Sequence, residues 1–233
     1  DSDDYINKEN FIKLLNNLDN QDLILFNYNI YNNNTKKFKK NIFKSEFNLI
    51  KNNKEKFIEL ICKRNDLYLW TFLIKKEIII KKQIDFLPYL FEDLEFLLKI
   101  IYHANTIEFI DLNIVNYRIN RDNQITKIHS YENISHRIIM SDIVIKQVQT
   151  YNLPKNIKEK LYSRIANIFY SAIPLIKTKN KEEQELLMDL IDNYSYILKY
   201  ASIKTIILKI LMKINKNFTY NSSNYFLRLF KLY

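Results

Sequence analysis

The first half of the chain mixes helical and strand-like patterns of apolar residues. Apolar residues spaced three and four positions apart are typical of a helix packed on one side, whereas apolar runs and alternations are typical of strands. Helical spacing predicts helices over residues 11–18 and 57–61, and one that opens at Glu92-Asp93. Strand patterns predict a buried strand over residues 22–28 and weaker or shorter strands over 36–43, 106–109 and 114–117. This half is therefore expected to be α/β.

The second half of the chain shows only helical spacing. After about residue 130, stripes of apolar residues begin at Ile134, Ile157, Leu187 and Ile203. Pro154 and the charged stretch 177–183 separate consecutive stripes, as breaks between helices do. We therefore expect an α/β domain over residues 1–128 and an α-helical region over residues 129–233.

The composition of the chain excludes several classes of protein. With 47% hydrophobic and 27% charged residues, the chain has too much apolar material for a disordered protein. It contains no glycine, which excludes the Gly-rich phosphate loops of P-loop, dinucleotide-binding and kinase proteins. Positions with positive φ should then fall to Asn and Asp, which tolerate the left-handed region best after glycine. The single cysteine, Cys62, excludes an intramolecular disulfide and a cysteine-rich zinc site.

The net charge of +10 is concentrated toward the end of the chain. From Asn193 onward there are seven Lys or Arg residues and no Asp or Glu. Lys209, Lys213 and Lys216 share one face of the helix predicted from Ile203, which either lies on an anionic membrane surface or packs on the domain. Nucleic-acid binding would rest on charge alone, because no recognised nucleic-acid motif is present. No apolar run reaches the length of about 18 residues that predicts a membrane span.

The residues that carry chemistry begin at Asp1-Ser2-Asp3-Asp4. By itself this cluster is typical of a helix N-terminus, because Asp and Ser cap helices and Asp suits the positive end of the helix dipole. The cluster becomes a specific signal only together with the motifs that follow it along the chain. They are the buried strand at 22–28, Trp70 leading into Lys75-Lys76-Glu77, Phe86, Glu92-Asp93-Leu94-Glu95-Phe96, and Tyr117-Arg118.

This series of motifs resembles the second half of a family-2 glycosyltransferase of the GT-A fold, the group that builds bacterial surface polysaccharides and lipooligosaccharides. The resemblance covers residues 1 to about 127. It implies that the nucleotide-binding half of the domain, which precedes the aspartates in the family, is absent from this chain. The implied fold class is α/β: the C-terminal part of a Rossmann-like GT-A domain, followed by an α-helical extension.

The resemblance assigns the opening aspartates to a divalent cation. Asp3 would bind Mg²⁺ or Mn²⁺ directly, Asp1 would contact the ribose or reach the cation through water, and Asp4 would lie in the same donor site. The physical reason is that the diphosphate of a nucleotide-sugar leaves with negative charge, which a hard cation held by oxygen ligands neutralises.

The resemblance also assigns the later acidic pair. Asp93 would be the general base that takes the proton of the acceptor hydroxyl, a role worth about 10²- to 10⁴-fold in rate, with Glu92 beside it in the substrate site. The helix dipole would lower the pKa of Asp93, whereas burial and the neighbouring Glu92 would raise it, and the sequence leaves both open. Taken alone, the pair is an ordinary acidic helix start.

Three further residues have two interpretations each. Trp70 either forms an apolar wall for the acceptor sugar or belongs to the core. Arg118 either pairs with the diphosphate or holds a structural carboxylate. His129 is either a third ligand to the cation or a surface histidine. No Ser/His/Asp or Cys/His arrangement supports covalent catalysis.

Together, these patterns predict an inverting, metal-dependent transfer of a sugar from a nucleotide diphosphate sugar to a glycan or lipid-linked acceptor. We expect a cytoplasmic protein, with peripheral attachment to the inner face of the cell membrane as an option, and no nucleic-acid partner. The alternative, from a different class, is a catalytically inactive fragment that acts as a basic helical module and binds membrane or partner proteins.

Overall fold

The computed structural model describes residues 4–41, 50–64, 68–120 and 129–201. The chain divides into two compact units. The sheet unit comprises Asp1–Leu87 and Phe96–Lys127, and the helical unit comprises Pro88–Glu95 and Ile128–Tyr233. The domain boundary expected at residue 128 stays a prediction. The grouping of Pro88–Glu95 with the helices matters for function, because this segment carries Glu92 and Asp93.

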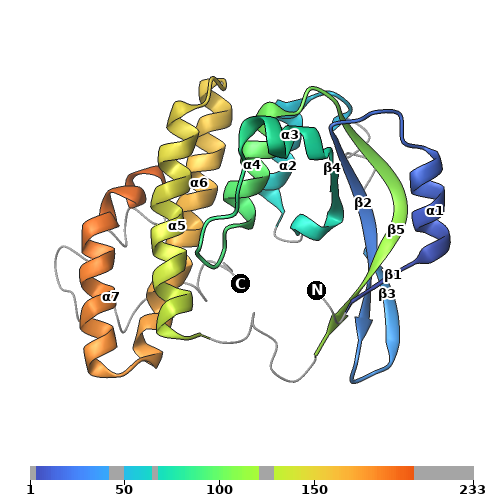
Figure 1. The fold of residues 1–233 in the computed structure, drawn as a ribbon. Helices are drawn as coiled ribbons and strands as arrows, with labels where there is room; N and C mark the ends of the chain where they lie inside the picture. The colour runs from blue at the N-terminus through green and yellow to red at the C-terminus, as the bar shows by residue number, and fades with distance from the viewer. Residues whose placement is uncertain (1–3, 42–49, 65–67, 121–128, 202–233) are drawn as a thin grey trace. The chain divides into compact units, whose positions relative to one another are not determined.

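A five-stranded sheet forms the centre of the sheet unit (Figure 1). Its path runs β1-β5-β2-β3, and β4 pairs with the beginning of β2. β2 and β5 are parallel, and the other pairs are antiparallel. The strands are β1 (Tyr5–Ile6), β2 (Leu23–Asn32), β3 (Lys37–Asn41), β4 (Phe72–Ile74) and β5 (Ile107–Ile119). The strands predicted over 22–28 and 36–43 correspond to β2 and β3.

The two short strands predicted over 106–109 and 114–117 are a single strand, β5, of 13 residues. β5 pairs with the 10-residue β2 over the whole length of both strands. The additional residues of β5 form a bulge where the register shifts on either side of Asn27. The buried amide of Asn27 donates a hydrogen bond to the Asp111 carboxylate at this point. The bulge interrupts the alternation of apolar and polar residues, which is why the sequence suggested two strands.

Helices cover both faces of the sheet: α1 lies on one face, and α2 and α4 lie on the other (Figure 1). Among the described residues before 104, the α-helices are α1 (Lys8–Asn16), α2 (Lys54–Lys63), α3 (Lys76–Lys82) and α4 (Asp93–His103), and a short 3-10 helix, η2 (Leu69–Thr71), precedes β4. The side chains of Asn7 and Asn53 cap α1 and α2 by accepting backbone N–H groups. Leu14 of α1 packs with Ile24 and Phe26 of β2 in one apolar cluster. The predicted helices near 11–18, 57–61 and 92–104 are thus present, and α3 is an addition.

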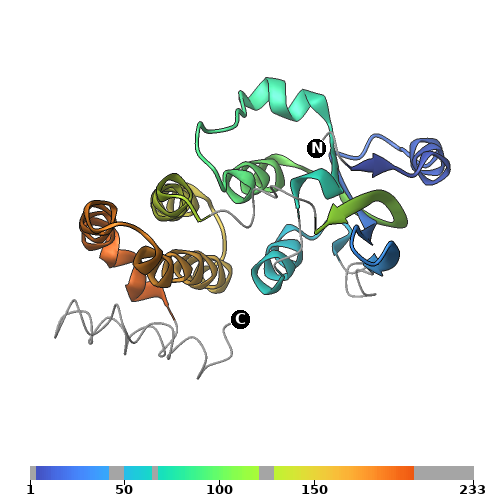
Figure 2. The ribbon, with the colours of Figure 1, turned by 90° about the horizontal axis from the view of Figure 1, so that it is seen from below.

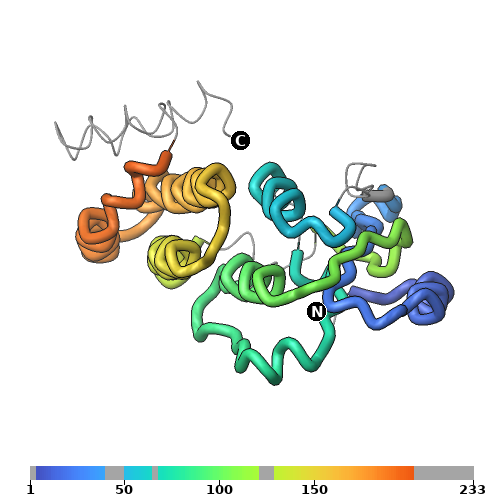
Figure 3. Tube along the Cα trace, turned by 90° about the horizontal axis from the view of Figure 1, so that it is seen from above, coloured from blue at the N-terminus to red at the C-terminus, as the bar shows by residue number. Residues whose placement is uncertain are grey.

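Three long helices build the described part of the helical unit. α5 (Tyr131–Thr150) packs against both α6 (Lys155–Ala172) and α7 (Lys181–Tyr194), as Figures 2 and 3 show. Short 3-10 helices, η4 (Ile173–Thr178) and η5 (Ser195–Tyr200), follow α6 and α7. Asn180 and Glu183 form a capping box at the start of α7, inside the charged stretch expected to be a break. The further helix predicted from Ile203 lies outside the described residues.

None of the helices in the described residues is both long and apolar enough to span a bilayer.

Six described residues that are not glycine have positive φ: Asn20, Lys36, Asn52, Gln83, Phe91 and Asn120. We expected Asn or Asp at such positions; three of the six are Asn, and none is Asp. Phe91 has φ 68°, which is costly for a bulky side chain because its Cβ crowds the backbone. It directly precedes Glu92-Asp93 in the sequence.

Candidate active site

The structure holds Asp4 against the end of β5. β1 pairs with β5 so that Tyr5 lies opposite Asn116, and the backbone N–H of Arg118 donates to Asp4 Oδ1 at 2.8 Å. Nε and Nη2 of the same arginine both donate to Asn33 Oδ1, each at 3.3 Å. Asp4 therefore contacts the backbone of Arg118, and the roles assigned to both residues stay predictions.

The other two opening aspartates lie outside the described residues. The assignment of Asp1 and Asp3 to a divalent cation therefore stays a prediction. Within the described part of the chain, no group of three or more His, Cys, Asp or Glu residues is placed to hold a metal ion. The donor chemistry nevertheless fits such an ion, because the segment is made of carboxylates and Asp4, its described member, is only partly buried.

Trp70 lies at the centre of a group of aromatic rings on the sheet unit. Its ring centroid is 4.9 Å from that of Tyr28, 5.1 Å from Tyr68 and 5.2 Å from Tyr117. Tyr68 stacks on Trp70 with an interplanar angle of 10°. We call Tyr28, Tyr68, Trp70 and Tyr117 the aromatic cluster. Tyr28 is buried, and the other three rings keep partial exposure.

The end of β5 contacts both the aromatic cluster and Asp4. Tyr117 belongs to the cluster, and the next residue, Arg118, binds Asp4 through its backbone. Ile24 and Phe26 of β2 belong to the apolar cluster with Leu14, whereas Tyr28, just beyond the irregular pairing at Asn27, packs on Trp70. Bulges commonly turn a side chain toward a new neighbour in this way.

Sequence reasoning missed the contributions of Tyr28, Tyr68 and Asn33. Tyr28 lies in a run that predicts a buried strand, so nothing in the pattern separated it from the core. Tyr68 precedes Trp70 by two residues, and this short aromatic alternation was the one available signal. Asn33 carries no signal, since its contact with Arg118 depends on the tertiary pairing of β2 with β5.

Asp93 is the first residue of α4, and its carboxyl group has an altered pKa. Burial of the carboxyl raises the pKa of Asp93 above its usual value, and the neighbouring Glu92 charge raises it further. Burial and the Glu92 charge both act in the direction that favours a base. The residue still keeps exposed surface, so it is accessible to a substrate.

α5 holds the segment that leads into Asp93. The backbone N–H of Leu90 donates to His136 Nδ1 at 3.0 Å, and the ring of Tyr89 packs edge-on against His136 with centroids 5.1 Å apart. The Arg137 guanidinium lies 4.6 Å from the centroid of the Phe91 ring. Arg137 is itself fixed by a hydrogen bond of 3.1 Å to Ser171 Oγ on α6.

These contacts give His136 and Arg137 a role that the sequence did not suggest. His136 is partly buried and accepts a hydrogen bond through Nδ1. Both residues belong to α5, and the segment they hold ends in Glu92-Asp93. The helical unit thus carries the candidate base on its own scaffold. His129 is exposed just ahead of α5.

Comparison with known proteins gives matches in structure alone. No protein-family model matches the chain, and no curated protein matches its sequence. S. aureus TarS 1-349 in complex with UDP-GlcNAc is similar with a TM-score of 0.67 and 14% sequence identity, over 98% of this chain and 66% of that chain. A second crystal structure of S. aureus TarS 1-349 is similar with a TM-score of 0.60 and 16% identity, over 98% of this chain and 65% of that chain.

The likeness to TarS confirms the expected fold class. The mixed α/β architecture, a central sheet with helices on both faces followed by a helical part, is the fold that the chain shares with these TarS chains. The chain spans about two thirds of the length of these TarS chains.

Proposed function

We propose that this chain is the catalytic part of a glycosyltransferase that moves a sugar from a nucleotide diphosphate sugar to a glycan or lipid-linked acceptor. The observation that supports this most is the fold shared with TarS, a protein described in complex with UDP-GlcNAc, over nearly the whole chain. The family-2 motif pattern assigns roles to Asp4, Arg118 and Asp93, and the hydrogen bond from the Arg118 backbone N–H to Asp4 is consistent with a shared site for the first two.

In the proposed reaction Asp93 acts as the general base. The acceptor hydroxyl oxygen attacks the anomeric carbon, its proton passes to the Asp93 carboxylate, and the bond from that carbon to the diphosphate oxygen breaks. A single displacement of this kind inverts the anomeric centre. A raised pKa suits the role, since a carboxylate with an ordinary pKa is a weak base at neutral pH.

The opening aspartates would hold a divalent cation in this proposal. Asp3 and Asp1 would bind Mg²⁺ or Mn²⁺, which would neutralise the charge of the departing diphosphate. Asp4 would act as a positioning residue, because the N–H of Arg118 occupies one of its carboxylate oxygens and ties the segment to β5. In this proposal the opening aspartates act on the donor and Asp93 acts on the acceptor.

Donor recognition gives the direct test of the proposal. The full-length protein is expected to bind a nucleoside diphosphate sugar in the presence of Mn²⁺, and to hydrolyse it slowly when no acceptor is supplied. A panel of nucleotide-sugars, measured by calorimetry and by release of nucleoside diphosphate with and without chelator, would show this. Absence of binding across the panel, with the protein folded by circular dichroism, would contradict the proposal.

Arg137 is expected to act as a positioning residue for Asp93. Arg137→Ala removes the guanidinium from the Phe91 ring and from Ser171, which loosens the segment before the base. We expect kcat to fall about tenfold, in line with the cost of a displaced catalytic group, while the KM for the donor changes little.

The conservative variant separates positioning from a general loss of structure. Arg137→Lys keeps a cation near the Phe91 ring and should recover part of the lost kcat, although it lacks the planar fork that reaches Ser171. Steady-state kinetics on both variants, with thermal melting alongside, make the test. Equal loss in both variants, or a loss carried entirely by KM, would rule out the positioning role.

The basic helical module considered as an alternative gains no specific support. It depends on the lysines beyond residue 201, which lie outside the described residues.

A further inference from the structure

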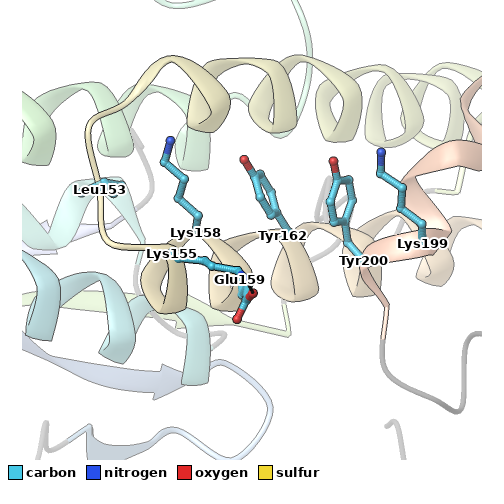
Figure 4. A pocket seen from close by; sticks show the side chains of 7 residues that line it. All are labelled: Leu153, Lys155, Lys158, Glu159, Tyr162, Lys199 and Tyr200. Carbon is cyan, nitrogen blue, oxygen red and sulfur yellow. Dashed lines mark ion pairs between the residues drawn. The ribbon is translucent and has the colours of Figure 1, made fainter.

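The helical unit contains a pocket that the proposed catalytic roles do not use. It has a volume of about 590 Å³, within the range of small-ligand sites. It lies between the beginning of α6 and η5 (Figure 4). We call it the Lys–Tyr pocket, and its lining residues are Leu153, Lys155, Lys158, Glu159, Tyr162, Lys199 and Tyr200.

Two tyrosine rings form the wall of the Lys–Tyr pocket. Tyr162 and Tyr200 lie with ring centroids 4.5 Å apart and planes inclined by 31°. Figure 4 shows their hydroxyl groups pointing the same way, with Lys158 next to Tyr162 and Lys199 next to Tyr200. Aromatic faces flanked by hydroxyl groups suit the C–H faces and hydroxyls of a sugar ring.

The lysines give the pocket a positive charge that is local. Lys155, Lys158 and Lys199 line it, and Glu159 is the one carboxylate among its described lining residues. Glu159 pairs with Lys155 at 3.9 Å, and both side chains are largely exposed, so this pair neutralises little of the charge. The described part of the helical unit as a whole carries nearly equal numbers of basic and acidic residues.

Two of these lysines are held in position while they keep the capacity to bind an anion. Lys158 Nζ donates to the Gln149 carbonyl at 3.2 Å, and an ammonium group has three N–H donors. Lys199 Nζ lies 4.7 Å above the Tyr200 ring and 5.7 Å from the Tyr196 ring. The first turn of α6 adds to the positive potential, because Pro154 gives it no side-chain cap.

We propose that the Lys–Tyr pocket binds a sugar that carries a phosphate or carboxylate group, as part of the acceptor. The sugar ring would lie against Tyr162 and Tyr200, and the acidic group would lie between Lys158 and Lys199. The inference that this ligand is the acceptor rests on the proposed glycosyltransferase function. The binding chemistry itself rests only on the pocket.

Binding of simple probes to the full-length protein tests the proposal. Glucose 1-phosphate is expected to bind more tightly than either glucose or inorganic phosphate, because only this probe meets both the rings and the lysines. Calorimetry or NMR titration would measure the three affinities. Inorganic phosphate binding as tightly as glucose 1-phosphate would show that the tyrosines contribute nothing, and would overturn the sugar part of the proposal.

Substitutions locate the binding in the pocket. Lys199→Gln and Lys158→Gln should each weaken glucose 1-phosphate binding about tenfold or more, as expected for the loss of a charge-assisted contact. Tyr200→Leu should weaken it by removing the stacking face. Lys181→Gln, an exposed lysine at the start of α7, is the matched control and should bind as wild type does. Equal binding by all of these variants, each folded by circular dichroism, would overturn the proposal.

Two further measurements identify the source of the ligand and distinguish failure of the pocket proposal from failure of the transferase proposal. Vesicles of phosphatidylglycerol that bind in a Lys199-dependent way would place the anionic group on a membrane lipid, and binding of the soluble probe alone would place it on a free glycan. Wild-type protein that binds a UDP-sugar but no glucose 1-phosphate and no vesicle contradicts the pocket proposal. If the wild-type protein binds glucose 1-phosphate but no nucleotide-sugar, the transferase proposal is contradicted and the pocket proposal is supported.

Discussion

Replacing Asp93 with Asn is expected to lower kcat by about 10²- to 10⁴-fold while the affinity for the nucleotide-sugar donor stays near that of the wild type. The amide has nearly the shape of the carboxyl group but cannot accept the proton of the attacking hydroxyl. Single-turnover transfer and donor binding, measured on the full-length protein, would show the split. Asp189→Asn, on the exposed side of α7, removes the same charge elsewhere and should leave kcat unchanged.

The same substitution should not destabilise the fold. A folded-state pKa above the usual value means that the folded protein disfavours the ionised Asp93 carboxylate, so this group reduces stability as the pH rises through its pKa. At neutral pH the Asn variant should therefore melt at the wild-type temperature or above it. Undiminished transfer, or a loss of activity that follows a loss of folded protein, would remove Asp93 from the mechanism.

The pH profile gives a second view of Asp93. Activity should fall on the acid side as Asp93 takes up a proton, and this limb should lie at higher pH than for an unperturbed aspartate, because burial and Glu92 both raise the pKa. Glu92→Gln removes the second cause and should shift the limb to lower pH. Glu185→Gln, an exposed change of the same charge, should leave the limb in place.

Replacing Trp70 with Ala is expected to cost about 3 kcal/mol in the free energy of unfolding. The indole contacts three other rings of the aromatic cluster, and its removal would leave a cavity beside the buried Tyr28. Denaturant unfolding would measure the loss. Tyr68→Ala removes a smaller ring that lies farther from Tyr28 and Tyr117, with centroid distances of 6.0 and 5.6 Å, and should cost less.

Trp70→Phe distinguishes the two interpretations of this residue. A phenyl ring retains much of the packing and should recover most of the stability. If Trp70 also forms the wall for an acceptor sugar, the smaller ring should raise the KM for the acceptor by up to about tenfold, the worth of one aromatic contact. A variant with recovered stability and a wild-type KM would assign Trp70 to the core alone.

The sequence predicted those parts of the fold whose patterns are local. β2 and the helices α4 to α7 follow from apolar periodicity and from breaks such as Pro154, and the structure has elements at all of these places. β5 was predicted as two strands because its bulge around Asp111 has no local signature. α3 was missed since its polar and apolar residues give no clear stripe and none of them is buried.

The candidate site was predictable only where a motif names its residues. Asp4, Trp70, Asp93 and Arg118 were chosen by resemblance, and the structure adds the neighbours that periodicity cannot supply. The contacts of Asn33 with Arg118 and of Arg137 with Phe91 join residues far apart in the sequence. Such pairings depend on how elements pack, which one sequence does not state.

The left-handed backbone of Phe91 links the candidate base to the integrity of the helices. A bulky residue in this region costs of order 1–3 kcal/mol, which glycine would largely avoid and which this glycine-free chain must offset elsewhere. On α5, His136 accepts a hydrogen bond from Leu90 and Arg137 packs on the Phe91 ring, and these contacts help to stabilise the segment. We therefore expect the segment to leave this conformation when α5 loosens. Gentle warming should accordingly abolish the proposed transfer activity while most of the secondary structure survives, so that loss of activity precedes melting.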